Sequence, residues 1–183
     1  IGLESNRYIL LSAHREENID IENNFISLMN SVNKMAETYN MPILYSCHPR
    51  SKKIIEKRGF VFDDRVIQNL PLGFFDYNKL QQNAFCVVSD SGTLPEESAF
   101  LKFPAVSIRT SSERPEALDK GVFVIGSITS DHVLQGVSMA VKMNEIGDNG
   151  EEVPSYTDEN VSTKVVKLIQ SYTNIVNKMI WRK

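Results

Sequence analysis

Short apolar runs alternate along this chain with longer stretches in which apolar residues recur every three or four positions. A short continuous apolar run is typical of a strand buried on both faces, and the three-to-four spacing is typical of an amphipathic helix. The pattern predicts strands at 8–11, 41–47, 66–70, 85–88, 104–108 and 121–126. It predicts helices at 21–39, 51–58, 95–101, 130–141 and about 158–180, and a loop at 71–77 that leads into a further helix through 80–83.

Strands that alternate with helices need crossover connections, which favour parallel pairing. We therefore expect an α/β fold, a Rossmann-like doubly wound parallel sheet of about six strands, in a single domain over residues 1–183. In such a sheet, ligands bind beyond the carboxyl ends of the strands. The polar residues that directly follow predicted strands should then share one rim; they are His14, His48, Tyr77, Ser91, Gly92 and the segment 111–114.

The stretch 90–97, Asp-Ser-Gly-Thr-Leu-Pro-Glu-Glu, joins a predicted strand to a predicted helix. Gly92 lets a ligand approach the backbone, Ser91 offers a hydroxyl, and the free N–H groups of a helix N-terminus attract a phosphate. A carboxylate one turn further on suits a ribose diol, because it accepts two hydroxyl hydrogen bonds. A simpler interpretation is a capping box, Thr93-x-x-Glu96, that only begins a helix.

Simple structural roles also exist for the other candidates. His14 has a side chain suited to acid–base chemistry, but it would serve equally as a surface imidazole. His48 precedes Pro49, which by itself favours an extended turn. Arg114 lies between Glu113 and Glu116 and would by default form a solvated ion pair with them. Convergence on one rim favours function for the set more than for any single member.

Composition narrows the class of partner. The net charge of −3 and the absence of a Lys/Arg block argue against nucleic acid, and no apolar run is long enough to span a bilayer. Cys47 and Cys86 lie in separate strand-like runs, as expected of buried thiols in a cytoplasmic protein. Two separated histidines do not make a zinc site, and neither GxGxxG nor a P-loop is present, so we expect no metal and no cofactor. The chain opens on Ile, and we expect it to be an excised domain or a cleaved product of a longer protein.

Four motifs in order resemble the C-terminal domain of the non-hydrolysing UDP-N-acetylglucosamine 2-epimerases. They are His-Arg-Glu-Glu-Asn at 14–18, His-Pro at 48–49, Asp-Ser-Gly with Glu96-Glu97, and Ser-Glu-Arg-Pro-Glu at 112–116. The resemblance implies one half of a two-domain fold like that of B-type glycosyltransferases (GT-B), with the active site in the cleft between the halves. It makes His14 the catalytic residue. It assigns UDP or substrate binding to Ser91, Gly92, Glu97, His48, Arg15, Glu17, Tyr77, Glu113 and Arg114, with the loop 72–77 beside the uracil.

The implied reaction inverts C2 of a UDP-N-acetylhexosamine by anti-elimination of UDP to a glycal, followed by re-addition. The acid–base carboxylates belong to an N-terminal domain that is absent here, so the isolated domain should be inactive, and the whole protein should be a homodimer. Glu16 stands where the family usually has a second Arg. This difference puts activation by a second substrate molecule in doubt, and the motifs look closer to the branch that makes UDP-N-acetyl-L-fucosamine for capsule and O-antigen.

Two rival functions remain open from the sequence. A glycosyltransferase of the same architecture would use the same UDP site but would hand the sugar to an acceptor. A nucleotide-binding regulatory module would keep the site without the chemistry.

Overall fold

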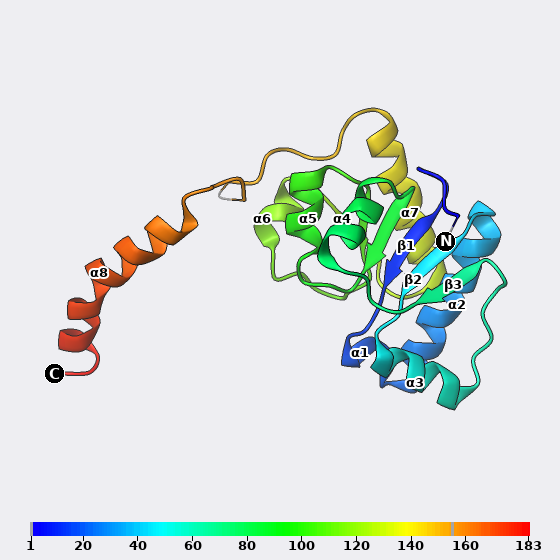
Figure 1. Ribbon diagram of the computed structural model, residues 1–183, viewed down its shortest axis with the longest axis horizontal. Coiled ribbons are helices and arrows are strands. Elements are labelled where there is room, and N and C mark those ends of the chain that lie inside the picture. Colours follow the sequence, from blue (N-terminus) through cyan, green and yellow to red (C-terminus); the bar gives the residue numbers. More distant parts are fainter. Residues whose placement is uncertain (1, 155) are drawn as a thin grey trace. The chain divides into compact units, whose positions relative to one another are not determined.

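The computed structural model describes residues 2–154 and 156–183, and within them the six strands form one parallel sheet (Figure 1). The strand order is β3-β2-β1-β4-β5-β6, and every neighbouring pair is parallel. This confirms the predicted doubly wound α/β fold. The strands are β1 (Ile9–Ser12), β2 (Ile43–Ser46), β3 (Val66–Asn69), β4 (Cys86–Ser89), β5 (Ala105–Ser107) and β6 (Val124–Ile125).

The register of the central strands positions the site. Leu10 of β1 pairs with Val87 of β4, and Ser12 pairs with Ser89, so the two strands end at the same level. On the other side of β1, Leu11 pairs with Tyr45 of β2. The residues that follow β1, β2 and β4 therefore emerge along one edge of the sheet, as the sequence predicted.

Helices cover both faces of the sheet. The helices of the first 153 residues are α1 (Glu16–Ile19), α2 (Glu22–Tyr39), α3 (Pro49–Arg58), α4 (Phe74–Gln82), α5 (Leu94–Leu101), α6 (Pro115–Asp119) and α7 (Ser130–Glu145), and α8 (Val161–Met179) follows in a separate unit. Helices α2 and α7 pack together on one face, while α4, α5 and α6 lie on the other (Figure 1). The buried face of α2 includes Phe25, Leu28, Val32 and Met35. This face packs against the apolar strands, as the spacing of its residues predicted.

Several local predictions were wrong. The loop after β1 contains the short helix α1, and the polar loop after β5 ends in α6, which begins at Pro115. Both are too short to show helical periodicity. Helix α4 begins at Phe74, so Tyr77 lies on a helix and not in the preceding loop. Helix α7 runs on to Glu145, and Thr129, not Ser130-Asp131, occupies its N-cap position.

The chain divides into two compact units, residues 1–153 and 154–183. The second unit contains α8, where the predicted closing helix is found. Its apolar residues follow helical spacing, yet none of its residues is buried. Among the described residues, no helix is both long and apolar enough to cross a membrane.

Candidate functional site

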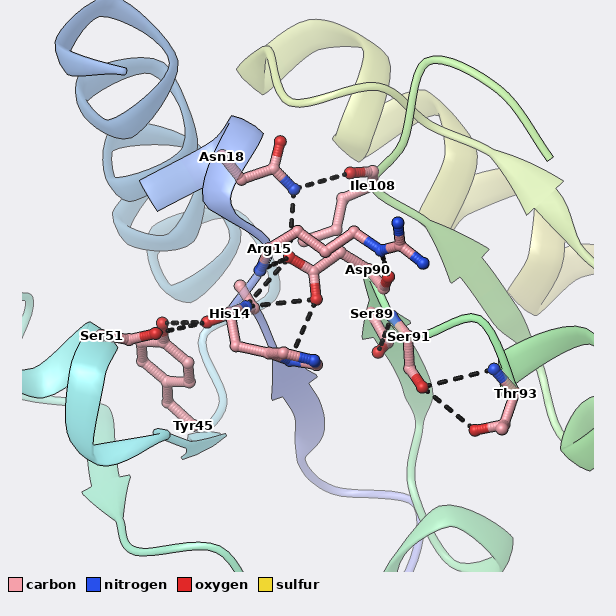
Figure 2. Close-up of polar contacts among 11 residues, drawn as sticks. His14, Arg15, Asn18, Tyr45, Ser51, Ser89, Asp90, Ser91, Thr93 and Ile108 are labelled. Atoms are coloured by element: carbon pink, nitrogen blue, oxygen red, sulfur yellow. Dashed lines mark hydrogen bonds and ion pairs between the residues drawn. The ribbon is translucent and has the colours of Figure 1, made fainter. Parts of the chain in front are cut away.

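Asp90, the first residue after β4, is the centre of the polar network at the rim (Figure 2). Its side chain is fully buried, and its carboxylate accepts hydrogen bonds from the main-chain N–H groups of His14 and Arg15, each at 2.9 Å. The buried amide of Asn18 donates a third, at 3.1 Å. Burying a carboxylate is costly unless it is hydrogen-bonded, and these donors satisfy it. Asp90 thereby fixes the loop that follows β1 against the end of β4.

The imidazole of His14 is held by the same carboxylate. Its Nδ1 lies 3.2 Å from Oδ1 of Asp90, and the side chain is 45% exposed. A carboxylate can only accept, so Nδ1 carries the proton in this contact and Nε2 remains available to a ligand. The ring of His48 lies close by, with 6.3 Å between the two ring centroids.

The backbone just before His14 is also anchored. The hydroxyl of Tyr45 donates to the carbonyl of Ala13 at 2.8 Å, and the hydroxyl of Ser51 donates to the same oxygen at 3.1 Å (Figure 2). Burial raises the pKa of Tyr45 well above its usual value, so this donor keeps its proton. Both contacts hold His14 in a fixed position relative to β2 and α3.

The turn between β4 and α5, where the sequence predicts a phosphate cradle, is organised by serine hydroxyls. The N–H of Ser91 donates to Oγ of Ser89 at 3.0 Å, and the N–H of Thr93 donates to Oγ of Ser91 at 3.3 Å. Gly92 is partly exposed, and a Cβ built on it would lie 3.5 Å from Nη2 of Arg15 and 3.7 Å from Oε2 of Glu113. The space above Gly92 is thus bordered by charged side chains, at the N-terminus of a helix.

The capping-box interpretation of this turn is wrong. Thr93 is the N-cap residue of α5, but its side chain makes no capping hydrogen bond. Its hydroxyl instead donates to Oε1 of Glu97 at 2.8 Å. Glu96, the supposed partner in the box, accepts from Nε of Arg114 at 2.5 Å.

Arginines and carboxylates surround the cradle. Arg109 is buried and donates to Oε1 of Glu113 at 2.7 Å, and Nη1 of Arg15 lies 3.9 Å from the same oxygen. The hydrogen bond from Arg109, with its charge, lowers the pKa of Glu113. Arg114, predicted to pair with its sequence neighbours, also reaches Glu96 on α5. Arg15 and Glu113 thus border Gly92, Arg109 is paired with Glu113, and Arg114 is paired with Glu96 on the helix that follows.

Glu97 lies one turn into α5, and both of its oxygens are engaged. Thr93 donates to one, and Nε2 of the buried Gln81 donates to the other at 2.6 Å. Tyr77 is close by: burial raises its pKa to about 12, and the charge of Glu97 adds to the rise. Tyr77 is therefore a neutral phenol at physiological pH.

The remaining two candidates have different surroundings. His48 is the N-cap of α3, where its Nδ1 accepts from the N–H of Arg50 at 3.2 Å, so it has a structural role as well as a place on the rim. Glu17 is exposed on α1. Among the described residues, no hydrogen bond or ion pair joins its side chain to the other candidates. Glu16, beside it, pairs with Arg50 at 2.8 Å.

Sequence reasoning gave no role in the site to four residues of this network: Asn18, Gln81, Asp90 and Arg109. Asp90 had a signal, since an acidic residue directly after an apolar strand run is unusual. Asn18 ends the motif at 14–18, whereas no sequence signal marked Gln81 or Arg109. In the described part of the chain, no three His, Cys, Asp or Glu side chains are grouped so as to hold a metal ion. What the site offers is donors for an anion beside an oriented imidazole.

Comparison with known proteins shows which family has a similar sequence. The family model of UDP-N-acetylglucosamine 2-epimerase matches residues 2–170. A UDP-N-acetylglucosamine 2-epimerase of Methanococcus maripaludis is 30% identical over 150 residues, which are 80% of this chain and 41% of that protein. A UDP-2,3-diacetamido-2,3-dideoxy-D-glucuronate 2-epimerase of Pseudomonas aeruginosa is 28% identical over 82% of this chain and 42% of its own length.

Solved structures of UDP-N-acetylglucosamine 2-epimerases have a fold similar to that of this chain. The UDP-N-acetylglucosamine 2-epimerase from Rickettsia bellii has a TM-score of 0.81 and 33% identity, covering 99% of this chain and 48% of that one. The Methanocaldococcus jannaschii enzyme, solved with UDP-GlcNAc and UDP, has a TM-score of 0.79 at 23% identity, covering 90% and 45%. The chain thus spans less than half the length of these relatives, as one half of a GT-B-type fold would. On the family match, the sequence identity and the shared fold, this chain belongs to the UDP-N-acetylglucosamine 2-epimerase family.

Proposed function

We propose that this chain is the UDP-binding, C-terminal half of a nucleotide-sugar 2-epimerase. The observation that carries the proposal is the placement of Asp90. This one carboxylate holds the imidazole of His14, and it directly precedes the Ser91-Gly92 turn. A leaving diphosphate bound at that turn would therefore lie beside a histidine whose tautomer is fixed.

Each part of UDP has a matching feature. The diphosphate binds above Gly92 at the N-terminus of α5, where Arg15, Arg109 and Arg114 offset its charge. The ribose hydroxyls donate to Glu97, whose oxygens keep lone pairs beyond those used by its protein donors. The uracil lies beside the loop 72–77, next to the exposed rings of Phe74 and Phe75.

The chemistry follows from these contacts. A base of the missing half removes the proton from C2 of the sugar, the C1–O bond breaks, and its electron pair leaves with UDP, giving a glycal. His14 and the cradle stabilise the charge that develops on the leaving diphosphate. UDP then adds back to C1, and a proton enters C2 from the opposite face. Net atoms and charge are unchanged, so the reaction is an isomerisation.

The substrate class rests on the relatives. One is described as a complex with UDP-GlcNAc and UDP, and another acts on a diacetamido sugar, which supports a UDP-N-acetylhexosamine in general. We propose the 6-deoxy sugars of capsule or O-antigen synthesis as the specific class, a cytoplasmic location, and a homodimeric full-length protein.

The test uses the longer polypeptide that contains this chain together with its other half. In heavy water, the epimerised product should carry deuterium at C2, because the proton that enters comes from a solvent-exchangeable group. Replacing His14 by Ala should slow turnover by roughly 10²- to 10⁴-fold, the usual contribution of one positioned acid–base group, with UDP affinity nearly unchanged. Product with only protium at C2, or sugar transfer that needs an added acceptor, would overturn the epimerase in favour of a glycosyltransferase.

A further inference from the structure

Gln81 is a buried polar side chain of α4 that the proposed reaction does not yet use. It is 1% exposed, and its Nε2 donates to Oε2 of Glu97 at 2.6 Å. Its own Oε1 is buried and has no hydrogen-bond partner among the described residues. Gln81 and Glu97 lie on different helices, so the contact ties α4 to α5 at the site.

The contact is the far end of a polar chain that reaches the phosphate cradle. Glu97 accepts from Gln81 on one oxygen and from Thr93 on the other, and the hydroxyl of Thr93 lies 3.0 Å from that of Ser91. A glutamate side chain has three rotatable bonds. These two donors, from two helices, fix its carboxylate in one orientation.

Helix packing alone does not explain an amide here. An apolar side chain of the same size would fill the space without leaving a buried oxygen unpaired, but it would also remove the donor that Nε2 gives to the carboxylate of Glu97. The unpaired Oε1 is therefore a cost, and what offsets it is the hydrogen bond that the amide gives to Glu97. Since Gln81 is buried, it does not touch a ligand itself.

We propose that Gln81 is a positioning residue for the nucleotide: it holds Glu97 so that the free lone pairs of the carboxylate meet the ribose diol. This inference rests on the proposed function, which assigns the diol to Glu97. It assigns to Gln81 a role in discriminating ribose ligands from those that lack the two hydroxyl groups.

The experiment compares the affinities of UDP and 2′,3′-dideoxy-UDP for this chain by titration calorimetry. The variants are Gln81→Met and Gln81→Leu, both apolar and of similar size, and the matched control is Gln82→Leu at the exposed neighbouring position. Both Gln81 variants should bind UDP about 3- to 20-fold more weakly, within the usual coupling between contacting residues, and should bind the dideoxy ligand as the wild type does. Thermal unfolding of each variant, measured beside its binding, shows that it is folded, and Gln82→Leu should change neither affinity.

A double variant separates positioning from other effects. In a Glu97→Gln background, Gln81→Met should cause no further loss of UDP affinity, because the carboxylate that it orients is gone. Equal weakening of both ligands by the Gln81 variants, or no weakening of either, would overturn the positioning role while the diol contact stands. If the wild type itself binds the two ligands equally, the assignment of the diol to Glu97 fails, and the role of Gln81 fails with it.

Discussion

Four nitrogen atoms contact the two carboxylate oxygens of Asp90. They are the main-chain N and the side-chain Nδ1 of His14, the main-chain N of Arg15 and the side-chain Nδ2 of Asn18. All of the donors come from a segment more than 70 residues earlier in the chain. Asp90 thus has two roles, and the sequence pattern alone does not distinguish one from the other. It closes the loop after β1, and it sets the tautomer of the candidate catalytic histidine.

We expect Asp90→Asn to lower the free energy of unfolding by roughly 1–3 kcal/mol, because an amide of the same shape leaves buried N–H donors without an acceptor. Urea denaturation measures this change. ¹⁵N NMR of the imidazole should show that the proton on Nδ1 of His14 is lost or shared with Nε2. Asp119→Asn, at a side chain that is 78% exposed, is the control and should change neither quantity. A variant of Asp90 with unchanged stability and an unchanged tautomer would remove this residue from the centre of the site.

At the scale of elements, the β4–α5 connection differs from an ordinary helix start. Its N-cap threonine gives its hydroxyl to Glu97 and not to the backbone, so no side-chain cap occupies the N–H of Glu96, which follows Pro95 in the first turn of α5. Such a group is suited to an anion. Gly92 lies at this point, and its φ is not left-handed, so the backbone conformation does not require a glycine. What the glycine provides is open space, because it has no side chain.

The variant Gly92→Ala should therefore fold normally but bind UDP more weakly. The added methyl meets Arg15 at 3.5 Å and Glu113 at 3.7 Å, which are ordinary contacts, so the melting temperature should be unchanged. The methyl would overlap a bound diphosphate, and a steric cost of about 1–3 kcal/mol weakens UDP binding by about 5- to 150-fold. Calorimetry with uridine is the control, and its affinity should not change. Equal UDP affinity in both proteins would place the diphosphate elsewhere.

At the scale of the whole molecule, the two compact units differ in what they bury. Residues 1–153 contain the sheet and the core, whereas α8 exposes a run of large apolar side chains. These include Val165, Leu168, Ile169 and Tyr172, each about half exposed or more. A contiguous exposed apolar face of this kind on a helix favours association.

A chain shortened to residues 1–157 should keep the unfolding free energy of the whole chain within about 0.5 kcal/mol, the usual range for surface changes. It should also lose any tendency to self-associate. Denaturation curves test the first expectation, and light scattering after gel filtration over a range of concentrations tests the second. A large loss of stability on truncation would mean that α8 contributes to the core of the longer chain.

Periodicity alone determined the α/β class, the parallel sheet and the rim, since these depend on burial patterns within single segments. Apolar runs mark strands because both faces of a parallel sheet are covered, and strand ends mark the rim because parallel strands share a direction. The four motifs then carried the family, which the comparisons confirm. Elements too short to show a period, such as α1 and α6, were missed for the same reason.

Tertiary structure alone decided the partners within the site. The sequence offered Thr93 and Glu96 as a local pair, but Glu96 contacts Arg114, 18 positions away, and Thr93 contacts Glu97. Likewise, Gln81 acquires its role only because α4 and α5 bring it to Glu97. Local patterns record whether a residue is buried, whereas a hydrogen bond between distant segments depends on where the packed elements place its two ends.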